Sequence, residues 1–142
     1  MVNLKSEFWS DKYSGNISLT NEMIGNCEKL IGFKLPEKFI TLLKDQNGGY
    51  TNSLFINDEI IIDEIFGIYF YEENPSILDT DYLTKEWSLP QKQVLISGDG
   101  HTWISLDYSS KLNPSVRFIN IEDNKNIILS SSFNDFLCKL QL

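Results

Sequence analysis

The stretch that decides the fold is Leu35 to Tyr50, LPEKFITLLKDQNGGY. Pro36 suits the first turn of a helix, where its missing N–H costs nothing, and it keeps Leu35 extended. An apolar stripe at helical spacing follows, formed by Phe39, Leu42 and Leu43 and widened by Ile40. Asn47-Gly48-Gly49 then ends the helix, because Asn and Gly tolerate the left-handed conformation of helix ends. The stretch predicts a helix of about three turns and a tight turn in which Gly48 or Gly49 has positive φ.

Four later segments complete a pattern with this stretch. They are Ile65-Phe66-Gly67-Ile68, Leu89-Pro90 followed by 94–100, WISLDY at 103–108, and SFNDFLCKL at 132–140. In this order, and over nearly the whole chain, the set resembles the SMI1/KNR4 (SUKH) superfamily. Many bacterial members of that superfamily are immunity proteins that neutralise polymorphic toxins. The resemblance therefore implies a SUKH-like fold and a toxin-binding role.

Two further helices are expected from caps and apolar spacing. Thr20 is a plausible N-cap and Gly32 a plausible end of a helix whose apolar face is Met23, Ile24, Cys27, Leu30 and Ile31. Ser132 is expected to cap the last helix, with Asp135 completing a capping box. Its residues Phe133, Phe136 and Leu137 are expected to share one core with Phe39 and Leu43. We also expect a short N-terminal helix with Leu4, Phe8 and Trp9, broken at Ser14-Gly15-Asn16, and a loop or helix at 77–87.

Strands are expected where β-branched and aromatic residues cluster between turn signals, at 54–56, 60–62, 65–71, 94–97, 102–107, 116–121 and 126–130. The last four form two hairpins, the first closed by Gly98-Asp99-Gly100-His101. Alternate residues of 66–71 are expected to face the core. Because the strands follow one another without long intervening helices, the fold class is α+β. We expect a largely antiparallel sheet of about five to six strands with the N- and C-terminal helices packed against it, in a single domain over residues 1–142.

Composition is consistent with a core that needs neither metal nor disulfide, since 42% of the residues are hydrophobic and 13% aromatic. Cys27 and Cys138 each fall on an expected helix without a second cysteine at metal-binding spacing, so both are expected to be buried, inert thiols. The N-terminus lacks the apolar core of a signal peptide, and no apolar run reaches the roughly 18 residues of a membrane span. A cytoplasmic protein without membrane contact is expected.

No residue constellation predicts catalysis. His101 is the only histidine, and although Asp99 and Asp107 lie near it in sequence, no nucleophile accompanies it, so an exposed loop histidine is expected. Gly98-Asp99-Gly100 lacks the spacing of a phosphate-binding loop and is explained by hairpin geometry. We therefore expect a protein that is not an enzyme and has neither a cofactor nor a metal.

The formal net charge of −8 resides in one segment, 58–86. It holds nine acids and one base, Lys85, while acids and bases elsewhere cancel. This charge argues against direct nucleic-acid binding, which needs clustered Lys and Arg. Two interpretations stay open: a solvated acidic edge that prevents aggregation, or a footprint for a basic partner. On the second, the candidate partner-binding residues are Asp58, Glu59, Asp63, Glu64, Glu72, Glu73, Asp79, Asp81 and Glu86, with Trp87 as an aromatic anchor.

Two functions fit these observations. The first is an immunity protein that occludes a basic toxin domain, expected to be a nuclease because nucleases carry basic clefts for a polyanionic substrate. The alternative is a non-catalytic regulatory or scaffold module of the SMI1/KNR4 type, although the fungal relatives of that kind carry long disordered extensions. The sequence leaves the oligomeric state open.

Overall fold

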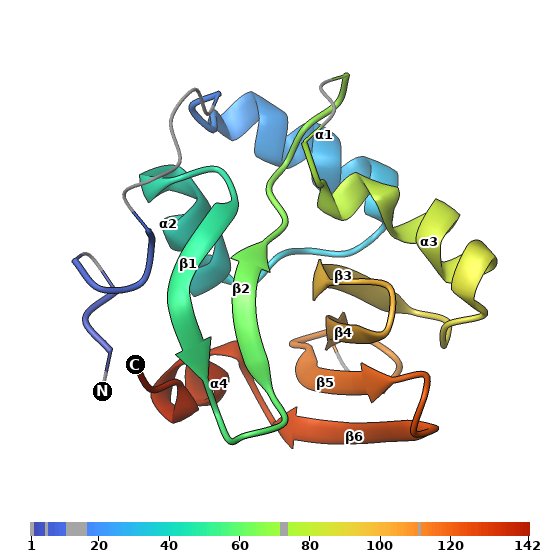
Figure 1. The fold of residues 1–142 in the computed structure, drawn as a ribbon. Helices are drawn as coiled ribbons and strands as arrows, with labels where there is room; N and C mark the ends of the chain where they lie inside the picture. The colour runs from blue at the N-terminus through green and yellow to red at the C-terminus, as the bar shows by residue number, and fades with distance from the viewer. Residues whose placement is uncertain (1, 5, 11–16, 72–73, 111) are drawn as a thin grey trace.

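The computed structural model describes residues 2–4, 6–10, 17–71, 74–110 and 112–142 (Figure 1). The chain begins with two helices, continues through a hairpin and a third helix into four consecutive strands, and closes with a fourth helix. The elements are α1 (Asn21–Ile31), α2 (Glu37–Asp45), β1 (Gly49–Phe55), β2 (Ile61–Ile65), the 3₁₀ turn η1 (Ile77–Asp79), α3 (Thr80–Trp87), β3 (Gln93–Gly98), β4 (Thr102–Asp107), β5 (Ser115–Asn120), β6 (Lys125–Ser130) and α4 (Phe133–Lys139).

The strands form two antiparallel sheets, the hairpin β1-β2 and the four-stranded meander β3-β4-β5-β6. The expected α+β class and antiparallel pairing are confirmed. The two sheets meet where the backbone N–H of Phe66 donates to the carbonyl of Ile96 at 2.8 Å and the Ser97 hydroxyl donates to the carbonyl of Glu64 at 2.7 Å. In Figure 1, α1 and α3 lie above the sheets, and α4 lies beside the hairpin at the lower left.

The predicted helix caps are present. The Thr20 hydroxyl accepts the Met23 N–H at 3.2 Å, and Gly32 ends α1 with φ 81°. Pro36 occupies the N-cap of α2, one residue before the helix begins. The Ser132 hydroxyl accepts the Asp135 N–H at 3.1 Å, as predicted for the N-cap. The Asp135 carboxylate accepts from the Ser131 hydroxyl instead of the Ser132 N–H, so the predicted capping box is only half formed.

One hydrophobic core contains both the organising helix and the last helix. Phe39, Leu43, Phe133, Phe136 and Leu137 are all buried in it, as expected. The rings of Phe39 and Phe133 pack edge to face with centroids 5.5 Å apart. These contacts join α2 to α4, so the two ends of the sequence share one core.

Two helical residues differ from expectation. Cys138 is exposed, because it falls on the side of α4 opposite its buried residues, so the prediction of a buried thiol holds for Cys27 and is wrong for Cys138. Leu30 is 66% exposed, so its predicted place on the core-facing side of α1 is also wrong. α1 turns only a narrow stripe inward, with Ile24 and Cys27 as its buried residues.

The turn after α2 docks onto the segment that follows β2. Gly48 has φ 81° and Gly49 has φ 116°, which confirms the predicted positive φ. The Asn47 side chain accepts the Ile68 N–H at 2.8 Å and donates to the Ile68 carbonyl at 3.0 Å. A Cβ on Gly67 would lie 2.3 Å from the carbonyl oxygen of Asn47, so the two backbones touch where only glycine fits. We call this contact the Asn47–Ile68 junction.

The junction explains why the predicted strand 65–71 is wrong. β2 ends at Ile65, and beyond it the chain forms only an isolated bridge between Gly67 and Ser76. The Asn47 amide, rather than a neighbouring strand, satisfies the backbone of Ile68. Residues 65–69 are all buried, so the expected alternation of buried and exposed side chains is absent.

Other elements also differ from expectation. The strand expected at 60–62 is β2, Ile61–Ile65. β1 starts at Gly49, five residues before the predicted strand, and carries a bulge between Tyr50 and Leu54. The ambiguous segment 77–87 is helical, started by a capping box between Ser76 and Asp79. In the described part of the N-terminus, residues 6–8 form a turn and Trp9 bridges to Thr51, so the short helix expected there is wrong. The predicted break at Ser14-Gly15-Asn16 lies outside the described residues.

Replacing Gly67 with alanine tests the junction. The added Cβ collides with backbone atoms of Asn47, which cannot rotate away, so we expect a loss of about 1–3 kcal/mol in the free energy of unfolding. Gly25→Ala is the matched control, because a Cβ there meets nothing within 4 Å and helix propensity favours alanine by about 1 kcal/mol. Urea unfolding of both variants measures the difference. Equal stability of Gly67→Ala and wild type would contradict the close contact.

Candidate partner-binding surface

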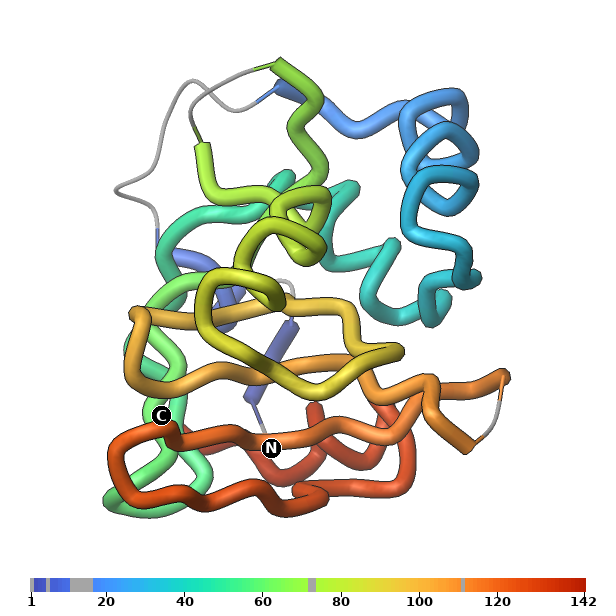
Figure 2. The backbone as a smooth tube through the Cα atoms, turned by 90° about the vertical axis from the view of Figure 1, so that its right-hand side faces the viewer, coloured from blue at the N-terminus to red at the C-terminus, as the bar shows by residue number. Residues whose placement is uncertain are grey.

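Three hairpin turns meet at one end of the molecule. They join β1 to β2 (56–60), β3 to β4 (99–101) and β5 to β6 (121–124), and all lie on the left in Figure 2. His101 Nδ1 lies 3.0 Å from Glu122 Oε1, and the Ile121 N–H donates to the His101 carbonyl at 2.9 Å. Lys125 Nζ lies 2.7 Å from Glu59 Oε2. These contacts connect the turns into one area, which we call the three-turn surface.

Side chains hold the turns in defined conformations. Asp99 Oδ1 accepts the N–H groups of His101 and Thr102 at 2.9 and 2.8 Å, and Asn57 Oδ1 accepts those of Glu59 and Ile60. Burial alone would raise the pKa of Asp99, but the hydrogen bonds from Thr102 and His101 lower it overall. Asp99 is therefore ionised at neutral pH, and its carboxylate is held in place by the turn that it caps.

The three-turn surface is acidic. Five exposed acids stand against one lysine, Lys125, and one histidine, His101. The acids are Asp58, Glu59, Asp99, Glu122 and Asp123. A surface of this charge attracts cations and basic proteins and repels nucleic-acid phosphates.

Trp87 borders this surface. Its ring packs on buried Trp103 with centroids 6.4 Å apart, and it lies 3.7 Å from the point where a Cβ of Gly100 would be. The side chain is nevertheless 40% exposed. Glu86 precedes it in the last turn of α3, and a hydrogen bond with Glu86 raises the pKa of Tyr82. An exposed aromatic ring on a rigid support, next to acids, has the properties of an interface anchor.

The acids predicted from sequence are divided among several places. Asp58 and Glu59 belong to the three-turn surface, Asp63 and Glu64 lie on β2, and Glu72 and Glu73 lie outside the described residues. Asp79 and Asp81 lie at the start of α3, in the upper half of Figure 1, away from the β1–β2 turn at the bottom. Burial raises the pKa of Glu64, and Asp79 accepts the Ser76 N–H as part of a cap.

Sequence reasoning missed Asp99, Glu122 and Asp123 as members of an acidic surface. Each lies outside the segment 58–86, in the rest of the chain, whose acids and bases are equal in number and sum to no net charge. The signal was in the predicted hairpins, because alternate turns of an antiparallel meander lie at the same end of the sheet. Grouping acids by turn instead of by sequence distance would have found them.

A groove of about 380 Å³ lies between the end of α1, α3 and the start of β3. Exposed Leu30 stands at its rim, and Lys92, with a positive φ of 58°, borders it on the other side. Its other lining residues include Phe33, Leu78, Asp81, Thr84 and Gln93. The lining combines apolar side chains with charges of both signs, so it favours no single ligand chemistry.

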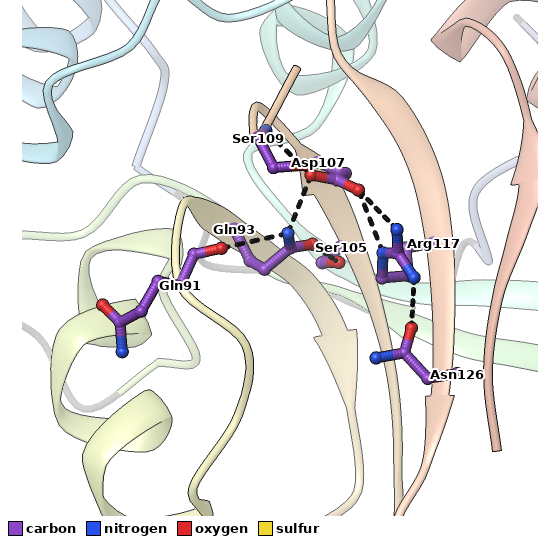
Figure 3. Close-up of polar contacts among 7 residues, drawn as sticks. All are labelled: Gln91, Gln93, Ser105, Asp107, Ser109, Arg117 and Asn126. Atoms are coloured by element: carbon purple, nitrogen blue, oxygen red, sulfur yellow. Dashed lines mark hydrogen bonds and ion pairs between the residues drawn. The ribbon is translucent and has the colours of Figure 1, made fainter.

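A polar network extends from this groove across the sheet (Figure 3). Gln93 Nε2 donates to Asp107 Oδ1 at 2.9 Å, and Ser105 donates to Gln93 Oε1 at 2.6 Å. Arg117 Nε and Nη2 both donate to Asp107 Oδ2, at 3.0 and 2.8 Å, and Nη1 donates to Asn126. Burial would raise the pKa of Asp107, but hydrogen bonds from Ser109, Arg117 and Gln93 lower it to about 2. Asp107 thus stabilises strand pairing.

His101 does not pair with either aspartate that sequence had placed near it. Its ring contacts Glu122, Asp99 binds its backbone N–H, and Asp107 is engaged by Arg117. His101 is exposed, as expected for a loop histidine. Among the described residues, no group of three or more His, Cys, Asp or Glu side chains could hold a metal ion. Over the same part of the chain, no helix is long and apolar enough to cross a membrane.

The fold and its surface define a small α+β module whose distinctive exposed feature is the acidic three-turn surface. The family model described as SMI1 / KNR4 family (SUKH-1) matches residues 18–139. Because this match covers most of the chain, the chain belongs to the SMI1/KNR4 family. None of the curated proteins compared with it gives a match.

The lowered pKa of Asp107 predicts how stability depends on pH. A folded-state pKa of about 2 against an ordinary value of 3.8 contributes on the order of 2 kcal/mol above about pH 5, and this contribution disappears as pH falls toward 2. Urea unfolding at pH 7 and pH 2.5 should show a smaller pH-dependent difference for Asp107→Asn than for wild type. Asp58→Asn, at an exposed turn, should keep the wild-type difference. An unchanged difference in Asp107→Asn would contradict this assignment.

Proposed function

We propose that the chain is an immunity protein, a module that binds a toxin domain and neutralises it by stoichiometric occlusion. Membership of the SMI1/KNR4 family supports a protein-binding role. The structure also supports a role in binding instead of catalysis. The polar network around Asp107 is engaged in strand pairing, and the one histidine is engaged by Glu122.

The observation that carries the proposal is the acidic three-turn surface. A nuclease toxin must bind a polyanionic substrate, so its active cleft is basic. Fixed carboxylates such as Asp99 and Glu122, held on connected turns, can occupy that cleft in place of phosphates. We therefore propose a basic toxin domain, of the nuclease class, as the partner.

Trp87 supplies the other half of the proposed interface. A typical interface places a desolvated aromatic anchor beside a polar rim. Trp87 has a rigid support in Trp103 and adjoins the acidic turns through Gly100. The remaining acids of the segment 58–86 enter the proposal through the net negative charge that they add, which strengthens the overall attraction of a basic partner. They include Asp63, Glu64, Glu72, Glu73, Asp79, Asp81 and Glu86.

Charge reversal tests this proposal. We expect Glu122→Lys/Asp123→Lys to bind the proposed partner, a basic toxin domain, with an association rate at least about tenfold lower at low salt. Folding stability should change little, because exposed charges contribute about 0–1 kcal/mol per pair. Glu22→Lys/Asp45→Lys changes the net charge equally on exposed positions of α1 and α2, and should keep most of the wild-type rate. Stopped-flow association at two salt concentrations gives these rates.

The outcomes separate the surface from the function. Equal rates for the two variants, without salt dependence in wild type, would contradict the three-turn surface as the binding face. Failure of the wild-type chain to bind the toxin domain, or to restore growth of cells that express it, would contradict the immunity role. That result would favour the regulatory scaffold instead.

A further inference from the structure

β6 (Lys125–Ser130) is the outer strand of the four-stranded sheet. It pairs with β5 on one side, and no other strand of the described chain lies on its outer side. Figures 1 and 2 both draw it at the lower margin of the sheet. The outward backbone N–H and C=O groups of an edge strand are a template for pairing with another chain.

The middle of this edge is apolar and exposed. Ile127 is 38% exposed and Ile128 is 47% exposed, and Asn126 before them is also exposed. In the pairing register, Ile127 lies opposite Phe118 and Ile128 opposite Arg117, so the two isoleucines face opposite sides of the sheet. A strand added to β6 would therefore bury apolar surface on both faces.

The lysines that usually guard such an edge are engaged elsewhere. Lys125 Nζ lies 2.7 Å from Glu59 Oε2, and Lys139 Nζ donates to the backbone carbonyl of Leu129. One lysine is thus held at each end of the strand, and the three residues between them carry no charge. Charged side chains over an edge are a common defence against strand addition. Here the two lysines are held at the strand ends, and Arg117 of the inner strand β5 reaches the Asn126 side chain, which leaves the two isoleucines exposed.

Charge decides which partner fits. β6 follows directly from the turn that carries Glu122 and Asp123, so the apolar edge and the three-turn surface are continuous. A strand lying along β6 passes these carboxylates, which complement Lys or Arg on the incoming chain. A second copy of this chain, with a net charge of −8, would meet like charge instead. We infer that β6 accepts an edge strand from a basic protein partner, by strand addition next to the acidic turn.

This inference rests on the proposed function: the basic partner is then the toxin domain, and β6 is the strand to which that domain adds its own. Steering by charge and strand addition predict opposite effects of one variant, Ile127→Glu/Ile128→Glu. Two added acids strengthen the attraction of a basic partner, whereas loss of the apolar edge weakens strand addition. Calorimetric titration with the toxin domain should show at least about tenfold weaker binding in spite of the added charge. Equal or tighter binding overturns the inference and leaves the proposed function standing.

Leu30→Glu/Leu112→Glu is the matched control, because it adds two acids at exposed apolar residues that are 66% and 92% exposed. Leu30 also lines the groove between α1 and α3. We expect this variant to bind at least as tightly as wild type. Loss of binding in the control instead of the edge variant would place the contact at Leu30 or Leu112 and overturn the inference. Urea unfolding of both variants confirms that they fold.

A second measurement does not depend on the toxin domain. A blocked hexapeptide of alternating arginine and valine is titrated into ¹⁵N-labelled protein, with alternating glutamate and valine as control. The basic peptide should shift the amide signals of residues 126–128, and the acidic peptide should not. No shift there with the basic peptide, or equal shifts with both, overturns the inference. A wild-type dimer that Ile127→Glu/Ile128→Glu dissociates would also overturn it, because a second copy would then occupy the edge.

Discussion

The paired hydrogen bonds between the Asn47 amide and the backbone of Ile68 fasten the turn after α2 to the segment after β2. They fix the position of the segment after β2. In the same segment the Phe66 N–H donates to the Ile96 carbonyl, and this bond joins the hairpin β1-β2 to the four-stranded sheet. That placement brings the β1–β2 turn beside β6, where Glu59 reaches Lys125. The exposed three-turn surface therefore depends on a buried contact in which the close approach of Asn47 to Gly67 leaves no room for a side chain.

Local signals predicted the helices and hairpins well, because caps and turns are decided by a few adjacent residues. Thr20, Gly32 and Ser132 act as expected. The segment 65–71 was misread because its composition suits a strand, while its backbone partner is the side chain of Asn47 from 21 residues earlier. Leu30 and Cys138 were misplaced for a related reason, since spacing does not reveal how wide a stripe each helix buries.

The candidate surface was only partly predictable. The sequence places the excess negative charge in 58–86. The acidic surface, however, depends on which turns the topology brings together, and its three turns come from separate regions of the chain. The residues that carry the family resemblance lie mostly in the interior, with Leu35, Asn47, Gly48 and Gly49 all buried. The acids of the turns are exposed, so packing constrains them less than it constrains these interior residues.

Amide hydrogen exchange of the chain, alone and in complex with the proposed toxin domain, tests the central claim most directly. The account predicts slower exchange in the turns 56–60, 99–101 and 121–124 and at Trp87, with the Ile68 amide protected in both states by Asn47. Protection confined to the groove between α1 and α3, with the three turns exchanging as in the free protein, would contradict it.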